Sequence, residues 1–198
     1  MIRTAFFAGG CFWCITPVFR AYHGVISVTS GYSGGNEEYP SYEDVKHQKT
    51  RHRETIKVEF DDSEVDFDML LDIYLANVDP FDGEGQFIDK GFSYTLAIFY
   101  ADEEQKAAAE AKIAALDHGE FSAFPFGLAS RLNSLAAKRM EITGEPPKAM
   151  IALKAFKSFY PAEEYHQDYD LKNPEAFAQE ISSSGRQHLN YDPEGKEL

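Results

Sequence analysis

The chain has 198 residues, of which 43% are hydrophobic, so it is long enough to form one globular domain with a substantial core. Its 33 acidic and 19 basic residues give a net charge of −14, which argues against binding to nucleic-acid phosphates or to anionic membrane surfaces. The apolar run at the N-terminus is too short for a signal peptide or a membrane span, and two cysteines one helical turn apart do not make an extracellular disulfide framework. We therefore expect a cytoplasmic monomer that binds neither nucleic acid nor membrane.

The first half of the chain alternates predicted strands and helices. The expected strands are Ile2 to Ala8, Val25 to Tyr32 and Glu54 to Phe60, and the expected helices are Cys14 to Tyr22, a short one from Ser41, and Asp66 to Asn77. In the third strand Ile56, Val58 and Phe60 alternate on one face, which is typical of a half-buried strand. The pattern indicates a mixed helix and strand protein.

The second half begins with a glycine-rich loop from Val78 to Gly91. We then expect a strand over Tyr94 to Tyr100, a helix from its cap Asp102 to about Leu116, a helical hairpin inserted at about 121–148, a strand near Ala149 to Leu153 and a helix from Ala162. The polar segment 182–198 is expected to be an extended or disordered tail. Residues 1–181 are therefore predicted to form a single catalytic domain.

The run Gly9-Gly10-Cys11-Phe12-Trp13-Cys14 lies where the first strand should turn into a helix, and it holds both cysteines of the chain. A thiol at a helix N-terminus faces unpaired N–H groups and the positive end of the helix dipole. Both favour the thiolate and lower the thiol pKa below its free value of about 8.5. Cys11 is therefore the candidate nucleophile, and Phe12 and Trp13 would place an apolar wall beside it.

The spacing of the two cysteines indicates a redox pair. Cys-x-x-Cys at a helix start puts both sulfurs on one face, close enough for a disulfide. A zinc site would need further ligands at finger spacing, and the six histidines are scattered, so we expect no metal. A general dithiol–disulfide oxidoreductase stays open at this point, because the same frame serves that class.

Five motifs in order resemble the class A peptide methionine sulfoxide reductase family, over roughly Phe6 to Tyr169. They are Gly10-Cys11-Phe12-Trp13, Gly31-Tyr32-Ser33-Gly34-Gly35, Pro40-Ser41-Tyr42, Arg51-His52-Arg53-Glu54 and Phe159-Tyr160-Pro161-Ala162-Glu163-Glu164-Tyr165-His166-Gln167. The resemblance implies an α+β fold, a two-layer α/β sandwich with a ferredoxin-like core and long coil segments. It also implies reduction of the S epimer of methionine sulfoxide, free or in oxidised peptides and proteins.

The resemblance assigns roles to individual residues. The Cys11 thiolate would attack the sulfoxide sulfur and become a sulfenic acid, while Glu54 protonates the sulfoxide oxygen. For that role Glu54 must lie in a desolvating pocket that raises its pKa from about 4.3. Tyr42 and Tyr94 would hydrogen-bond the oxygen. The remaining matched positions are Asp89, in the family's acidic pattern before Tyr94, and the pair Phe12 and Trp13, which would receive the S-methyl group.

Regeneration of the nucleophile depends on the second cysteine. Many family members use cysteines near the C-terminus for this step, and the present chain has none there. Cys14 is therefore expected to form the disulfide with Cys11, which thioredoxin or a small dithiol would then reduce. The resemblance implies no metal and no organic cofactor.

Three departures from the family pattern keep alternatives open. The loop Val78 to Gln86 follows the family only in part, and the segment 121–148 is extra. Around Tyr94 the usual Gln-Tyr-Arg-Ser is replaced by Ser93-Tyr94-Thr95-Leu96, which removes an arginine that would steady Asp89. A binding protein that recognises methionine sulfoxide without turnover therefore remains a third hypothesis beside the reductase and the general dithiol oxidoreductase.

Overall fold

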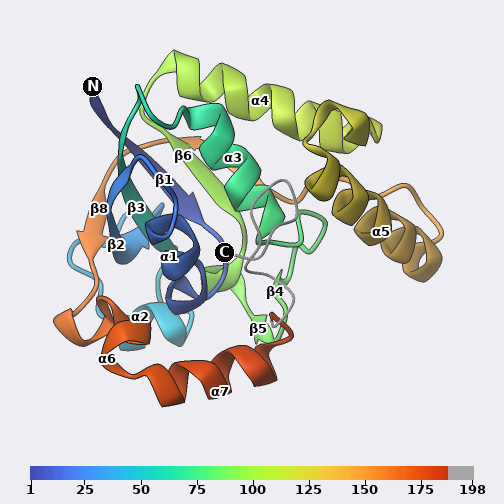
Figure 1. Cartoon of the computed structure of the whole chain (residues 1–198). Coiled ribbons are helices and arrows are strands. Elements are labelled where there is room, and N and C mark those ends of the chain that lie inside the picture. The colour runs from blue at the N-terminus through green and yellow to red at the C-terminus, as the bar shows by residue number, and fades with distance from the viewer. Residues whose placement is uncertain (187–198) are drawn as a thin grey trace.

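The strand expected at the N-terminus lies in the middle of a six-stranded sheet. A computed structural model describes residues 1–186. The sheet has the order β7-β6-β1-β3-β2-β8, with β6 and β7 parallel and every other neighbouring pair antiparallel. Its strands are β1 Ile2–Ala8, β2 Val25–Ser33, β3 Arg53–Asp61, β6 Ala97–Tyr100, β7 Ala152–Ala155 and β8 Phe159–Pro161, and a separate ribbon pairs β4 Gly85–Gln86 with β5 Asp89–Lys90 (Figure 1).

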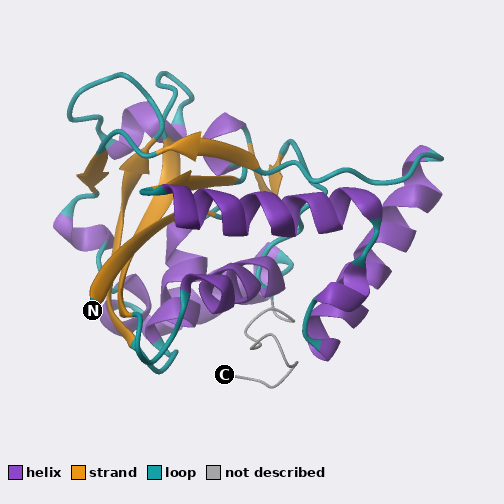
Figure 2. Cartoon of the chain, turned by 90° about the horizontal axis from the view of Figure 1, so that it is seen from above, coloured by secondary structure: helices purple, strands orange, loops and turns teal. Residues whose placement is uncertain are grey.

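Helices pack on the sheet and extend beyond one end of it. The α-helices of the described residues are α1 Phe12–Arg20, α2 Tyr42–Lys46, α3 Phe67–Ala76, α4 Glu103–His118, α5 Phe126–Thr143, α6 Tyr169–Lys172 and α7 Pro174–Ser184, and three short 3-10 turns cover Phe92–Tyr94, Phe121–Ala123 and Glu164–His166. Figure 2 shows the strands as one layer, with helices beside it and α5 projecting away from the sheet. The predicted α+β sandwich is confirmed.

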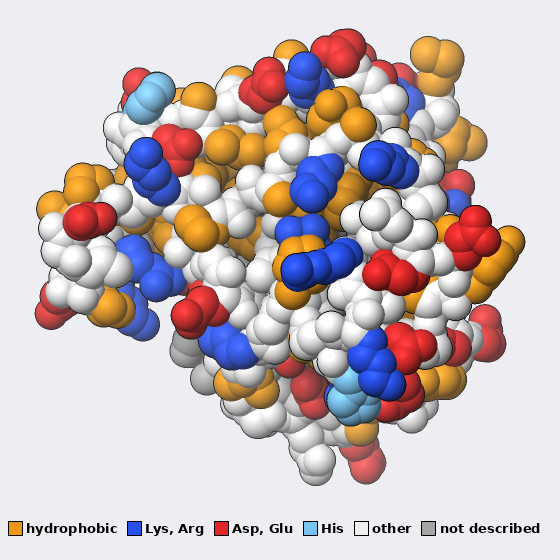
Figure 3. Space-filling view, turned by 180° about the vertical axis from the view of Figure 1, so that it is seen from behind, with side chains coloured by type: hydrophobic (Ala, Val, Ile, Leu, Met, Phe, Trp, Pro, Cys, Tyr) orange, Lys and Arg blue, Asp and Glu red, His pale blue; other side chains and the backbone are white. Residues whose placement is uncertain are grey.

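The alternation of β1 divides its side chains between two apolar clusters. Phe7 is fully buried, and its ring stacks on Phe19 of α1 at 5.3 Å and on Tyr74 of α3 at 5.2 Å between centroids. Phe6 points to the opposite face, where it stacks on Phe156 at 4.0 Å. Figure 3 views the molecule from behind, where hydrophobic side chains are visible between basic and acidic ones. The period of two along β1 thus attaches α1 and α3 to one face of the sheet.

Helix α1 begins at Phe12 instead of Cys14, so Cys11 is its N-cap. Gly10 makes the turn from β1 at φ +84°, a conformation that favours glycine. A helix that started at Cys14 would carry Pro17 in its first turn, where proline is tolerated, whereas the earlier start places Pro17 inside the helix.

Several expected boundaries are wrong in the second half. The segment 121–148 holds a 3-10 turn and the single long helix α5 in place of a helical hairpin, because residues 126–143 contain no proline that would divide them. Tyr94 ends a 3-10 turn and β6 starts only at Ala97. A helix does not start at Ala162; a 3-10 turn is followed by α6 and α7.

The expected polar tail begins later than residue 182. Helix α7 continues through Ser184, and both Ser184 and Arg186 are buried. The rest of the expected tail, residues 187–198, lies outside the described part. No helix within residues 1–186 is both long enough and apolar enough to cross a membrane.

Candidate active site

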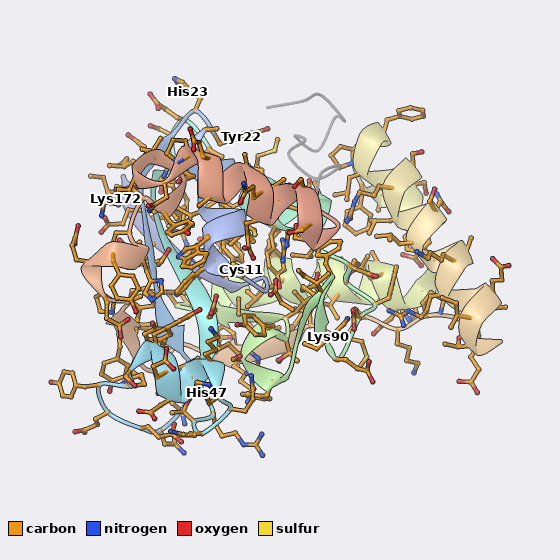
Figure 4. All side chains as sticks on the ribbon, turned by 90° about the horizontal axis from the view of Figure 1, so that it is seen from below. Cys11, Tyr22, His23, His47, Lys90 and Lys172 are labelled. Atoms are coloured by element: carbon orange, nitrogen blue, oxygen red, sulfur yellow. The ribbon has the colours of Figure 1, made fainter. Side chains whose placement is uncertain are left out.

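The two thiols meet at the first turn of α1. Both cysteines are free, and Cys11 and Cys14 are only 7% and 6% exposed. Figure 4 shows Cys11 at the start of α1. The hydrogen bond with Cys14, together with burial, raises the pKa of Cys11, whereas the same hydrogen bond and the charge of Arg186 lower the pKa of Cys14. The expectation of a low Cys11 pKa is therefore wrong for the resting pair, because burial and the neighbouring sulfur outweigh the helix terminus.

Glu54 supplies a buried carboxyl group beside the nucleophile. On β3 it has the same side-chain direction as Ile56, Val58 and Phe60, so it points into the core, where it is 2% exposed. One of its oxygens accepts a hydrogen bond of 3.0 Å from the backbone N–H of Phe12, the first residue of α1. Burial outweighs that bond and raises the pKa of Glu54 to about 8. The group therefore carries a proton at neutral pH, as a general acid must.

Tyr42 and Tyr94 approach the same carboxyl from two further segments. Tyr42 opens α2, and its backbone N–H donates 2.9 Å to Glu163, whose other oxygen accepts the Tyr32 hydroxyl at 2.8 Å. Burial, and then the charge of Glu54, raise the pKa of both Tyr42 and Tyr94. Both hydroxyls therefore stay protonated and are available as hydrogen-bond donors.

An aromatic group surrounds the first turn of α1. The indole N–H of Trp13 donates to Nδ1 of His166 at 3.1 Å, and its ring lies parallel to Tyr169 at 3.8 Å between centroids. Trp13 is half-buried, but Phe12 is only 1% exposed and packs against Tyr32 and His166. The apolar wall therefore consists mainly of Trp13 at the surface, with Phe12 behind it.

Asp89 lies in the β4–β5 ribbon, and its charge acts on both thiols. Its Oδ2 is buried and has no hydrogen-bond partner among residues 1–186. Burial raises its pKa, while the charge of Arg186 lowers it. The neighbouring Gln86 is fully buried and ties the loop together through the backbone of Asp79 at 2.7 and 3.0 Å.

The structure thus brings all the predicted site residues to one end of β1 and β3, and it adds three that were given no definite role. Glu163 and His166 belong to the late motif noted in the sequence, and that motif was the available signal for them. Arg186 lies in the segment expected to be a tail, and no sequence pattern pointed to it. No group of three or more His, Cys, Asp or Glu that could hold a metal ion occurs within the described range.

Paired thiols beside a buried, protonated carboxyl define a thiol-dependent oxidoreductase with its own acid. Comparison with known proteins specifies the family: residues 3–126 and 130–197 match the model of the family described as peptide methionine sulfoxide reductase. The chain belongs to the peptide methionine sulfoxide reductase family.

Individual relatives agree with this assignment. The chain is 44% identical over 180 residues to peptide methionine sulfoxide reductase MsrA 2 of Staphylococcus aureus, covering 90% of this chain and 88% of the relative. It is 40% identical over 183 residues to MsrA of Bacillus licheniformis, covering 92% and 88%. Among solved structures, methionine sulfoxide reductase A of Corynebacterium diphtheriae superposes with a TM-score of 0.65 at 25% identity, covering 87% of this chain and 76% of that one.

Proposed function

We propose that this protein reduces methionine-S-sulfoxide, free or in peptides and proteins, to methionine, with Cys11 as nucleophile and Glu54 as acid. The observation that carries the proposal is the buried Glu54 carboxyl, which hydrogen-bonds the first N–H of the helix that Cys11 caps. A thiolate cannot displace oxygen from a sulfoxide unless that oxygen is protonated. A general dithiol oxidoreductase would need no such acid.

The proposed cycle has two halves. In the first, the Cys11 thiolate forms a bond to the sulfoxide sulfur while Glu54 gives its proton to the oxygen. The hydroxyl then moves from the substrate sulfur to the Cys11 sulfur, which breaks the substrate S–O bond and the new S–S bond. Methionine leaves, reduced by two electrons, and Cys11 is left oxidised as a sulfenic acid. Tyr42 and Tyr94 donate hydrogen bonds to the same oxygen, and Trp13, with Phe12 behind it, receives the S-methyl group. In the second half Cys14 displaces the hydroxyl and forms the disulfide, which thioredoxin or a small dithiol reduces.

No metal or organic cofactor takes part in this cycle. We assign the whole reaction to one catalytic domain, residues 1–181, acting as a monomer in the cytoplasm. The buried Ser184 and Arg186 extend that unit by a few residues at its C-terminal end.

The decisive experiment is turnover of the two pure sulfoxide epimers with dithiothreitol. Three directions at the sulfoxide sulfur are fixed by the site. Trp13 and Phe12 receive the methyl group, Glu54 and the two tyrosines bind the oxygen, and Cys11 sets the direction of attack. Only the S epimer is therefore expected to react. Cys11→Ser should abolish turnover, because a hydroxyl forms almost no anion at neutral pH. Equal rates on both epimers, or activity in Cys11→Ser, would overturn the proposal.

A second arm tests the role of Cys14. In Cys14→Ser the first turnover should still yield methionine and leave a sulfenic acid on Cys11 that a dimedone-type reagent traps. Thioredoxin should support this variant much less well than the wild type, whereas small thiols attack Cys11 directly. Thioredoxin-driven turnover that survives the substitution would show that Cys14 is not the resolving thiol.

A further inference from the structure

Arg186 is a buried cation at the back of the thiol pair. It follows α7, which ends at Gly185 in the left-handed conformation, and its side chain is 2% exposed. Its Nη2 donates 3.0 Å to the carbonyl of Gly9, and its guanidinium carbon lies 4.6 Å from the centre of the Phe87 ring. The chain therefore returns from its C-terminal helix to the turn that precedes Cys11.

The turn is built to admit this guanidinium. A Cβ added to Gly10 would lie 2.5 Å from Nη2 of Arg186 and 2.7 Å from Cβ of Gln86, so no other residue fits there without displacing them. Gly10 thus serves two purposes: it adopts φ +84°, and it leaves space for the cation.

The charge of Arg186 is not balanced by an ion pair within the described part of the chain. Its Nε is buried without a hydrogen-bond partner there, and the same holds for Oδ2 of Asp89. A buried guanidinium without a counter-charge is costly, so the groups that gain from it are those that become anionic nearby. They are the Asp89 carboxyl and the Cys14 thiol, whose pKa values the charge of Arg186 lowers.

We propose that Arg186 is a positioning residue that holds Cys14 as a thiolate for the disulfide-forming half of the cycle. The inference rests on the proposed function for that step. This role would explain why a buried cation lies at a turn where only glycine leaves enough space for it.

The step is balanced without any further reactant. The Cys14 thiolate attacks the sulfur of the Cys11 sulfenic acid, the S–S bond forms and the S–O bond breaks. The Cys14 sulfur is oxidised and the Cys11 sulfur reduced, and the departing hydroxide takes up a proton to leave as water. Only the deprotonated sulfur of Cys14 is nucleophilic enough to do this.

Among the charged groups that act most strongly on Cys14, Arg186 is the cation that lowers its pKa. The others are Cys11 at the start of α1, Glu54 on β3, Asp89 on β5 and Glu180 on α7. Asp89 and Glu180 raise the pKa of Cys14, and the hydrogen bond from Cys11 lowers it. Removing Arg186 would therefore take away a positive charge that offsets Asp89 and Glu180 at Cys14.

The first test measures the Cys14 thiolate directly and needs no turnover. In a Cys11→Ser background Cys14 is the only thiol, and its ultraviolet thiolate absorbance can be titrated against pH, with Cys11→Ser/Cys14→Ser subtracted for the tyrosines. Adding Arg186→Met should raise the apparent pKa by about one unit, or roughly tenfold less thiolate at fixed pH. Arg186→Lys should restore most of the thiolate. Arg3→Met removes an arginine that pairs with Asp102 and Glu104, away from the site, and should leave the titration unchanged.

The second test follows one turnover in otherwise unaltered protein. Arg186→Met should slow disulfide formation about tenfold relative to wild type, whereas the rate of methionine formation should change little. The sulfenic acid on Cys11 should then last long enough to be trapped. An unchanged titration in Arg186→Met, or equal losses in Arg186→Met and Arg186→Lys, would show that Arg186 is only structural. Failure of the proposed function would appear separately, as wild-type protein that forms no methionine.

Discussion

Glu54 shows how one position in a strand determines the chemistry of a site. Its place on β3, in register with Tyr32 of β2, puts the carboxyl into the core, and the N–H of Phe12 compensates only one oxygen. The remaining cost of burial raises its pKa to about 8. The carboxyl therefore keeps its proton up to about pH 8 and can donate it to the sulfoxide oxygen at neutral pH.

A pH profile of the first turnover tests this role. The step needs protonated Glu54 together with the Cys11 thiolate, so loss of the Glu54 proton above about pH 8 should add an alkaline limb to the profile, in which the rate no longer follows the rising thiolate fraction. Glu54→Gln keeps the shape and cannot donate a proton, so methionine formation should slow by roughly 10²-fold and lose that alkaline limb. Rapid-quench measurement of methionine from pH 6 to 9 gives both readings. An unchanged single-turnover rate in Glu54→Gln would assign the acid elsewhere.

At the scale of elements, β1 joins the helices that carry and support the site. Phe7 stacks on Phe19 near the end of α1 and on two rings of α3, so this one side chain ties both helices to the sheet. The C-terminal segment then closes the site from the opposite direction, through α7 and Arg186.

Phe7→Ala should destabilise the protein by about 3–5 kcal/mol, the range for removing a fully buried phenylalanine. Ile2→Ala on the same strand is the matched control, because Ile2 is 69% exposed and its loss should cost about 0.5 kcal/mol or less. Urea unfolding of the three proteins measures both effects. Similar losses at the two positions would contradict the central place of Phe7 in the core.

At the scale of the whole molecule, the acid that serves the reaction weakens the fold as pH rises from about 4.5 to about 8. The folded state holds the Glu54 proton up to about pH 8, whereas the ordinary pKa of a glutamate is 4.5. Between these values the folded protein binds more protons than the unfolded chain, so this group's contribution to stability is full below 4.5 and is lost as pH rises through 8.

The free energies of unfolding of wild type and Glu54→Gln should therefore be similar near pH 5 and diverge as pH rises. Near pH 9 the variant should be more stable by a few kcal/mol, at about 1.4 kcal/mol for each unit of pKa difference. Other titrating groups are common to both proteins, so the difference between the two urea curves isolates Glu54. A difference that does not change with pH would show that the carboxyl is not held protonated.

Much of this protein could be predicted from the residues alone, because the informative patterns are local. The period of two in β1 and β3, the cap at Asp102 and the Cys-x-x-Cys turn each depend on neighbours in the chain, and the structure confirms the elements they predict. The nearness of Glu54 to Cys11 also followed, from the resemblance of the motifs to a family. The single helix α5 was not predicted, because the spacing of apolar residues is the same in one long helix as in two shorter helices joined by a turn.

Tertiary structure alone decided the charges of the site. A low pKa for Cys11 was expected from the helix terminus, but burial and the Cys14 sulfur reverse it, and both are consequences of packing. Arg186 stands 172 residues after Cys14 in a polar segment, and only the fold brings its guanidinium to the glycine turn beside that thiol. A local pattern reports which backbone a segment prefers, whereas the electrostatic surroundings of a buried group depend on segments that meet only after folding.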